Sequence, residues 1–307
     1  MQSTDTILMI EPVAFGFNAQ TAVNNYFQVN DESKETQSEA LREFNAFVDK
    51  LRSKGVNVIT VKDTLDPHTP DSIFPNNWVS FHQDGTVILY PMFAENRRLE
   101  RRSDILDQLS GKGLSITAIK DYSVFEAENK FLEGTGSMIL DRENKIAYGA
   151  ISLRLDEEIF RKWCAEFGYK PVVFHSFQSV NGERLPIYHT NVTMCVGSDY
   201  AVICLDTIDD ATEREQVEKA LTESHKEVIE ISDEQMQNFA GNMLEVRNND
   251  GNKFLVMSEC AYKSLTSRQI QTIEAHAEIL YSDLHTIEKN GGGSARCMMA
   301  EVFLPKK

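Results

Sequence analysis

Side chains able to do chemistry recur along this sequence at nearly constant spacing. Successive members of the set are separated by 56, 56, 53 and 55 residues. If the chain is built from repeated units around a common axis, equivalent positions of those units meet at that axis. A thiol, an imidazole and a carboxylate brought together there would supply a nucleophile, a proton shuttle and a group that orients the shuttle. The five positions are Asn77, Glu133, His189, Asn242 and Cys297.

Cys297 is the candidate nucleophile of this set. It follows the glycine-rich segment Gly291–Ser294 and is adjacent to Arg296, and a neighbouring cation lowers the pKa of a thiol. Taken alone, a cysteine that precedes two methionines is more often a small core residue, and a lone histidine is more often structural. The shared spacing is what favours catalysis. The remaining cysteines are interpreted as structural: Cys164, Cys195, Cys204 and Cys260.

Each candidate lies at the start of a predicted β-hairpin, in which two β-rich runs flank a polar turn. A predicted helix and one further apolar run follow, which indicates a unit of strand, strand, helix and strand. The polar turns are Asp84–Gly85, Arg142–Asn144, Gly197–Asp199 and Asp250–Gly251. Capping boxes are predicted at Thr36/Glu39, Thr212/Glu215 and Thr266/Gln269, with an N-cap at Asp156. A further helix is predicted through Leu99, Leu106 and Leu109 to Gly111. Closing strands are predicted at Val56–Val61, Lys170–Phe174 and Val228–Ile231.

The repeat predicts an α/β fold, a closed five-bladed propeller of ββαβ units with pseudo-symmetry. Ala295–Phe303 is expected to pair with Ile7–Glu11, which splits the fifth hairpin between the two ends of the sequence and removes exposed edges. No change in composition and no Pro/Gly-rich linker marks a boundary, so residues 1–307 are expected to form a single catalytic domain. The alternative is a doubly wound sheet in two domains, which two strands per helix disfavour.

The composition excludes several classes of protein. The 307 residues include 31 basic and 47 acidic side chains, a net charge of −16, which disfavours binding to nucleic acid or to an anionic membrane. No apolar run approaches the roughly twenty residues that span a bilayer, and Met1–Phe17 lacks the features of a signal peptide. Five cysteines without a C-x-x-C motif argue against a disulfide framework or a zinc site. A cytoplasmic location is expected.

Two other motifs give weaker signals. The segment Glu133–Ser137 is glycine-rich, but it lacks the third glycine of a dinucleotide loop and the lysine of a phosphate loop. The basic residues Arg97, Arg98, Arg101 and Arg102 are interleaved with acidic residues at helical spacing, which is typical of a solvated helix face. No pair of histidine and carboxylate has metal-binding spacing, so no metal site is expected.

Three segments together resemble the guanidino-modifying enzymes, the superfamily of arginine deiminases, dimethylargininases and amidinotransferases. They are Phe131–Gly134, Tyr188–Asn191 and Gly292–Met298. Pro70–Phe74 is similar to the substrate loop of dimethylargininases, and Gly149–Arg154 to their carboxylate-binding segment. The resemblance covers essentially the whole chain and is greatest for hydrolases of the citrulline-utilisation type. It implies the pentein fold, which is the five-bladed propeller that the repeat predicts.

The resemblance also implies a role for each candidate. Cys297 would be the covalent nucleophile, His189 the general acid/base, and Glu133 the partner that fixes and polarises His189. Arg154 would bind the α-carboxylate of an amino-acid substrate, and Asp71 its α-amino group. Neither a metal nor an organic cofactor is implied.

Two positions depart from the family pattern. Asn76–Asn77 replaces a carboxylate of dimethylargininases, and Asn191 replaces the aspartate of the His-x-Asp motif in arginine deiminases. A neutral ureido group needs the donors and acceptors that amides supply, whereas a buried guanidinium needs opposite charge. The amides therefore favour citrulline, hydrolysed to ornithine, ammonia and carbon dioxide. Asn242 is expected to line the same site.

Other activities remain open at this point. Dihydrolases that act on arginine derivatives also use asparagine in the site, and Glu133 offers one negative charge to a guanidinium, so an arginine deiminase or dihydrolase is the first alternative. An amidinotransferase differs only in excluding water from the covalent intermediate. The non-enzymatic alternative is a catalytically silent propeller that acts as a binding protein. Assembly into a homo-oligomer is left open.

Overall fold

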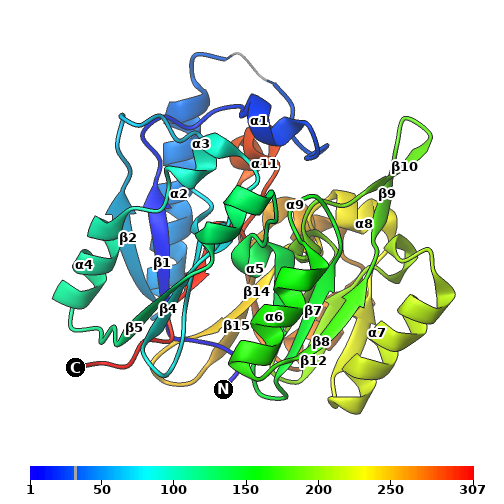
Figure 1. Ribbon diagram of the computed structural model, residues 1–307. Helices are drawn as coiled ribbons and strands as arrows, with labels where there is room; N and C mark the ends of the chain where they lie inside the picture. The colour runs from blue at the N-terminus through cyan, green and yellow to red at the C-terminus, as the bar shows by residue number, and fades with distance from the viewer. Residues whose placement is uncertain (31–32) are drawn as a thin grey trace.

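The computed structural model describes residues 1–30 and 33–307. Within these residues, five three-stranded sheets share one pattern of strands (Figure 1). In each of them the middle strand pairs antiparallel on one side and parallel on the other. A helical crossover connects the two parallel strands, as parallel pairing requires. The strand, strand, helix, strand unit is therefore confirmed, and no extended doubly wound sheet is found in the described residues.

The sheets follow one another along the chain. They are β17 (Ala300–Glu301), β1 (Thr6–Glu11) and β2 (Asn57–Lys62); β3 (Val79–Phe81), β4 (Thr86–Leu89) and β5 (Ala118–Asp121); β6 (Met138–Asp141), β7 (Ile146–Ala150) and β8 (Lys170–Phe174); β11 (Met194–Val196), β12 (Tyr200–Ile203) and β13 (Glu227–Glu230); and β14 (Leu244–Arg247), β15 (Lys253–Ser258) and β16 (Glu278–Ser282). The crossover helices are α2 (Thr36–Ser53), α4 (Ser103–Gly111), α6 (Glu157–Phe167), α7 (Ala211–Glu223), and α9 (Glu259–Ser264) with α10 (Ser267–Glu274).

The fifth hairpin is split between the two ends of the chain, as predicted. β1 pairs antiparallel with β17, with Ile7 opposite Glu301 and Leu8 opposite Ala300. The paired part is shorter than expected, because only Ala300–Glu301 of Ala295–Phe303 is a strand. A hairpin that the sequence did not predict, β9 (Phe177–Val180) with β10 (Glu183–Pro186), projects at the upper right of Figure 1.

Two of the predicted helix starts are confirmed. Asp156 caps α6 by accepting from the Ile159 N–H, and Thr266 forms a capping box with Gln269 at α10. The box at Thr212 is wrong, because Asp210 caps α7 and a carboxylate is a stronger acceptor at a helix N-terminus.

The first two predicted helices also need correction. The N-cap of α2 is Glu35, so Thr36 already lies inside the helix. The second predicted helix is interrupted. The chain forms the short α3 (Glu95–Arg98) first, and Leu99 follows it as an exposed side chain before α4 begins at Ser103.

The five equivalent positions lie in the turns that lead into the first strands, two to five residues before each strand begins. Asn77 ends a 3₁₀ turn before β3, Glu133 precedes the short α5 (Gly134–Ser137) before β6, and His189 precedes a 3₁₀ turn before β11. Asn242 and Cys297 precede β14 and β17 in the same way. The prediction that these residues open the strands is therefore wrong by two to five residues, because each of them lies in the turn before its strand.

The hydrophobic core is divided among neighbouring repeats. For example, Val217 and Leu221 of α7 belong to the same buried cluster as Val172 and Phe174 of β8, in the preceding repeat. Each helix therefore covers the sheet before its own as well as the strand that it connects. In the described residues, no helix is long and apolar enough to cross a membrane.

Candidate active site

A small cavity gathers side chains from segments far apart in the sequence. Its volume is about 10 Å³, so the surrounding side chains nearly fill it. α1 (Ala19–Ala22) and α11 (His285–Gly291), whose residues contribute to its wall, lie at the upper end of the molecule in Figure 1, and both chain termini lie at the lower end. Five of the sequence-predicted site residues line it: Asp71, Asn77, Arg154, His189 and Cys297.

His189 and Glu133 form a buried pair beside the cavity. His189 Nε2 lies 2.7 Å from Glu133 Oε2, and the other carboxylate oxygen accepts from the Phe93 N–H. Burial raises the pKa of Glu133, but Arg154 and His189 outweigh it and lower the pKa to about 2. Burial lowers the pKa of His189 to about 4 in spite of Glu133. At neutral pH the pair is thus a carboxylate and a neutral imidazole, which can accept a proton.

The sulfur of Cys297 is contacted by two amides. Asn191 Nδ2 and Asn242 Nδ2 donate to Sγ at 3.3 Å and 3.2 Å. Asn242 is held by the Arg296 N–H, which donates to its Oδ1 at 3.1 Å. Both asparagines are buried. Two N–H donors therefore face negative charge that develops on the sulfur when it attacks a substrate.

The charge of Arg296 is directed away from the sulfur. Its Nη2 lies 2.8 Å from Glu301 Oε2, and its Nη1 donates to the Met299 carbonyl. The prediction that the Arg296 guanidinium acts on the sulfur of Cys297 is therefore wrong. The groups that contact the sulfur are the amides of Asn191 and Asn242. In the glycine-rich segment before Cys297, Gly291 is the last residue of α11 and Gly292 is its C-cap, in the left-handed conformation.

Arg154 and Asp71 lie on the cavity wall and contact the N-terminal segment. Arg154 Nη1 is 3.6 Å from Glu133 Oε2, and its Nε donates to Asn24 Oδ1 at 3.0 Å. The guanidinium also lies 4.7 Å from the centre of the Tyr188 ring. Asp71 Oδ2 accepts from the Asn18 side chain at 2.8 Å. Burial raises the pKa of Asp71, against the effect of Arg97.

Arg97 is a site residue that the sequence analysis assigned to a solvated face, and that assignment is wrong. Arg97 is buried and lines the cavity. Its Nε lies 2.8 Å from Glu100 Oε1 and 3.8 Å from Asp71 Oδ2, and its Nη1 donates to Asn77 Oδ1 at 2.7 Å. Arg97 and Glu100 have the three-residue spacing of a surface pair on a helix, but both side chains lie inside the protein.

Gly136 allows the two sides of the site to approach each other. A Cβ at this position would lie 2.2 Å from Asn77 Nδ2 and 2.9 Å from His189 Nδ1. No side chain larger than hydrogen fits there without moving one of these residues. In the described part of the chain, no group of three or more histidine, cysteine or carboxylate side chains is arranged to hold a metal ion.

Solved structures of guanidino-modifying enzymes have the same fold. The apo form of ArgZ, an arginine dihydrolase from the ornithine-ammonia cycle in cyanobacteria, matches with a TM-score of 0.74 and 18% identity over 98% of this chain and 41% of ArgZ. A variant of AgrE in complex with L-arginine matches with a TM-score of 0.73 and 16% identity over 98% of this chain and 40% of AgrE. The chain thus spans about two fifths of the length of ArgZ and AgrE.

A third structure matches over its full length. DDAH from Pseudomonas aeruginosa, in a variant complexed with citrulline, has a TM-score of 0.65 and 14% identity over 98% of this chain and 100% of that protein. The family model described as N,N dimethylarginine dimethylhydrolase, eukaryotic, matches residues 11–304. The chain belongs to this family, within the guanidino-modifying pentein superfamily. Among curated protein sequences, no match was found.

Proposed function

We propose that this protein is a cysteine-dependent hydrolase of a ureido or guanidino group on an amino acid, with citrulline as substrate. One observation supports this most strongly. Cys297 lines the same cavity as His189, whose ring contacts the ionised Glu133, and the guanidinium of Arg154 lies on the wall of that cavity. A nucleophile, a proton shuttle with its orienting carboxylate, and a cation for a substrate carboxylate are thus within one small space.

The chemistry proceeds in two halves. The neutral His189 accepts the thiol proton, and the sulfur attacks the ureido carbon of citrulline. The resulting imidazolium, stabilised by Glu133, donates the proton to the departing ammonia and leaves a thiocarbamate on Cys297. Water, deprotonated by His189, then displaces the sulfur, and the carbamate that is released decomposes to ornithine and carbon dioxide. The sum is citrulline and water converted to ornithine, ammonia and carbon dioxide.

Unpartnered acceptors support the binding of an amino acid. Within the described residues, the buried Asp71 Oδ1 and Asn191 Oδ1 have no hydrogen-bond partner. Buried acceptors are normally satisfied, and the α-ammonium and the ureido NH₂ of citrulline could satisfy these two. Asp71 would then bind the α-amino group, Arg154 the α-carboxylate, and Asn77 and Asn191 the ureido end, with Asn242 holding the sulfur.

The charges around the cavity favour a neutral reacting group. Glu133 is already paired with His189 and Arg154, and Asp71 lies 3.8 Å from Arg97. Asn77, which stands in place of a family carboxylate, accepts from Arg97 and has no charge to offer. Among the described residues, a guanidinium in this cavity would lie near Arg97 and Arg154 and would find no carboxylate that is not already paired with one of these arginines. Its burial would therefore cost free energy that the burial of a neutral ureido group does not.

The second candidate activity is that of an arginine dihydrolase. It is favoured by the similarity to ArgZ, an arginine dihydrolase, and to a variant of AgrE that binds L-arginine. In that reaction the same Cys297 and His189 would act twice, first on arginine and then on citrulline. An arginine deiminase, an amidinotransferase and a catalytically silent binding protein are weaker alternatives.

We further propose that residues 1–307 form one domain in which the sheets surround a common axis as a five-bladed propeller. β1, near the start of the chain, pairs with β17, near residue 300, and residues from several repeats meet in one cavity. These two features support an arrangement of the repeats around a shared centre rather than in a row.

A parallel assay of ammonia and ornithine release tests the function. Citrulline, arginine and dimethylarginine are offered separately to the purified protein and to Cys297→Ala. We expect citrulline to be hydrolysed at least tenfold faster, in kcat/KM, than arginine, and Cys297→Ala to be inactive on all three. Release of two ammonia molecules per arginine at a comparable rate would establish the dihydrolase instead, and no turnover of any of the three would contradict the proposal.

A further inference from the structure

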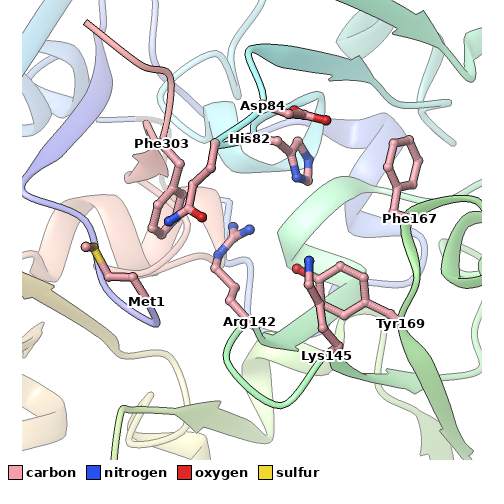
Figure 2. Close-up of a pocket in the computed structure, with 9 residues that line it drawn as sticks. Met1, His82, Asp84, Arg142, Lys145, Phe167, Tyr169 and Phe303 are labelled. Atoms are coloured by element: carbon pink, nitrogen blue, oxygen red, sulfur yellow. The ribbon is translucent and has the colours of Figure 1, made fainter.

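A second cavity lies at the end of the molecule opposite the candidate active site. It has a volume of about 280 Å³ and is lined by residues near both termini (Figure 2). Three strands connect the two cavities. Asn77, Glu133 and Cys297 come before β3, β6 and β17, whereas His82, Arg142 and Phe303 follow the same three strands. The second cavity is therefore built by the fold in the same way as the first, at the other ends of its strands.

The walls of this cavity combine aromatic rings with cations. Figure 2 shows Phe303 on one side and Phe167 with Tyr169 on the other, with Arg142 and Lys145 between them. The Arg142 guanidinium lies 4.3 Å from the centre of the Phe303 ring, and Lys145 Nζ lies 4.5 Å from the centre of the Tyr169 ring. Rings that already face a cation can also stack on a ligand ring.

The positive charge here exceeds the negative charge available to neutralise it. Glu301 is shared by two guanidinium groups, because its carboxylate lies 3.4 Å from Arg142 and 2.8 Å from Arg296. Among the residues that the structure describes, Lys145 forms no ion pair. Among the described residues that line the cavity, Asp84 supplies one negative charge against the two positive charges of Arg142 and Lys145. An anion that enters would therefore meet cations that lack full compensation.

His82 contributes a flat, neutral wall. Its ring stacks on Phe167 with a centroid separation of 5.7 Å and an interplanar angle of 16°, and its Nε2 contacts Ser80 Oγ at 2.9 Å. Burial, together with the charge of Arg142, lowers the pKa of His82 to about 3. The histidine is therefore uncharged at neutral pH, and the cationic character of the cavity comes from Arg142 and Lys145.

We propose that this cavity is a binding site for a small aromatic anion, a single ring that carries a carboxylate or a phosphate. The ring would lie between the aromatic walls, and the anionic group would contact Arg142 and Lys145. The volume is at the lower end of the range for ligand sites, which fits one ring and excludes a dinucleotide. The site is separate from the candidate active site and does not depend on the proposed reaction.

Calorimetric titration of the full chain tests this site. The probes are benzoate and phenyl phosphate, with benzamide as the neutral aromatic control and with acetate and inorganic phosphate as anions without a ring. We expect at least one aromatic anion to bind tenfold or more tightly than all three controls. Lys145→Gln should weaken that binding about tenfold, because an exposed cation is removed without disturbing the core.

Lys170→Gln is the control for Lys145→Gln. Lys170 is also exposed and directly follows the cavity residue Tyr169, but it does not line the cavity itself. It should bind the aromatic anion as the unmodified protein does. The proposal is overturned if Lys145→Gln binds as tightly as Lys170→Gln, if acetate or phosphate binds as well as the aromatic anions, or if citrulline displaces the aromatic anion, which would place binding at the active site instead.

Discussion

In the candidate active site, the sulfur of Cys297 is held by two asparagine amides rather than by a cation. Burial raises the pKa of Cys164, Cys195 and Cys204 to about 12, whereas Cys297 lines the cavity and its sulfur accepts from two side-chain amides. We expect iodoacetamide, followed by mass spectrometry, to label Cys297 ahead of Cys164. Labelling of Cys164 first would contradict the assignment of the nucleophile.

Cys297→Ser should abolish turnover, with a loss of at least 10³-fold in kcat, because a hydroxyl is a far weaker nucleophile than a thiolate at neutral pH. The fold should persist, as measured by circular dichroism and thermal unfolding. Cys260→Ser is the control, since Cys260 is exposed and lies outside the cavity. An active Cys297→Ser protein, or equal losses in the two variants, would exclude covalent catalysis by Cys297.

Asn77 is the residue on which we expect substrate choice to depend. Asn77→Asp keeps the acceptor for Arg97 and adds a negative charge to the cavity wall, which stabilises a guanidinium and not a ureido group. The ratio of kcat/KM for arginine over citrulline should rise tenfold or more, measured by ammonia release. Asn252→Asp, in an exposed turn, makes the same charge change far from the cavity. A ratio that moves no further in Asn77→Asp than in Asn252→Asp would contradict selection by charge.

The short helix α5 shows how an element positions the site. Gly136→Ala would direct a methyl group into Asn77 and His189, so we expect kcat to fall at least 100-fold while the protein still folds. Gly111→Ala, at the end of α4, is the control because no atom lies within 4 Å of its Cβ position. Steady-state kinetics on both variants decides the matter. Comparable activity in the two would show that the close approach at Gly136 has no functional role.

Helix starts with one strong capping residue could be predicted from the sequence. Starts at which two side chains compete to cap the same helix could not. α6 and α10 begin where their caps predicted, because Asp156 and Thr266 have no better acceptor nearby. At α7 the cap moved to Asp210, since a carboxylate competes successfully with a hydroxyl at a helix N-terminus. The equivalent positions fell in turns rather than on strands, because one-turn segments have no periodicity to detect.

In the candidate active site, too, some residues could be predicted from the sequence and others could not. The repeat spacing located Asn77, His189 and Cys297, which line one cavity. It could not locate Arg97, because a basic residue near an acidic one looks the same in sequence whether the pair is on the surface or buried. The contacts of Arg97 with Asp71 and Asn77, which lie 26 and 20 residues earlier in the chain, show that Arg97 belongs to the site.

Across the whole molecule, buried histidines make stability depend on pH. The folded-state pKa of His82 is lowered to about 3 from its ordinary value near 6.5. Between these values the unfolded chain binds a proton that the folded protein does not, so stability is lost as the pH falls below 6.5. From pH 7 to pH 5 the contribution of His82 to the free energy of unfolding should fall by about 2 kcal/mol.

Urea unfolding of the protein and of His82→Gln at both pH values isolates this contribution, because the other titrating groups are common to both proteins. The difference in free energy of unfolding between them should change by about 2 kcal/mol in favour of His82→Gln at pH 5. A difference that is independent of pH would show that His82 titrates alike in the folded and unfolded states.

The pairing of β1 with β17 places residues almost three hundred positions apart in one sheet. During synthesis, Ile7 and Leu8 therefore remain without their antiparallel neighbours until Ala300 and Glu301 have left the ribosome. The first strand of the chain therefore cannot complete its sheet until the last strand has been synthesised. A nascent chain stalled shortly before Ala300 should stay sensitive to protease near its N-terminal end.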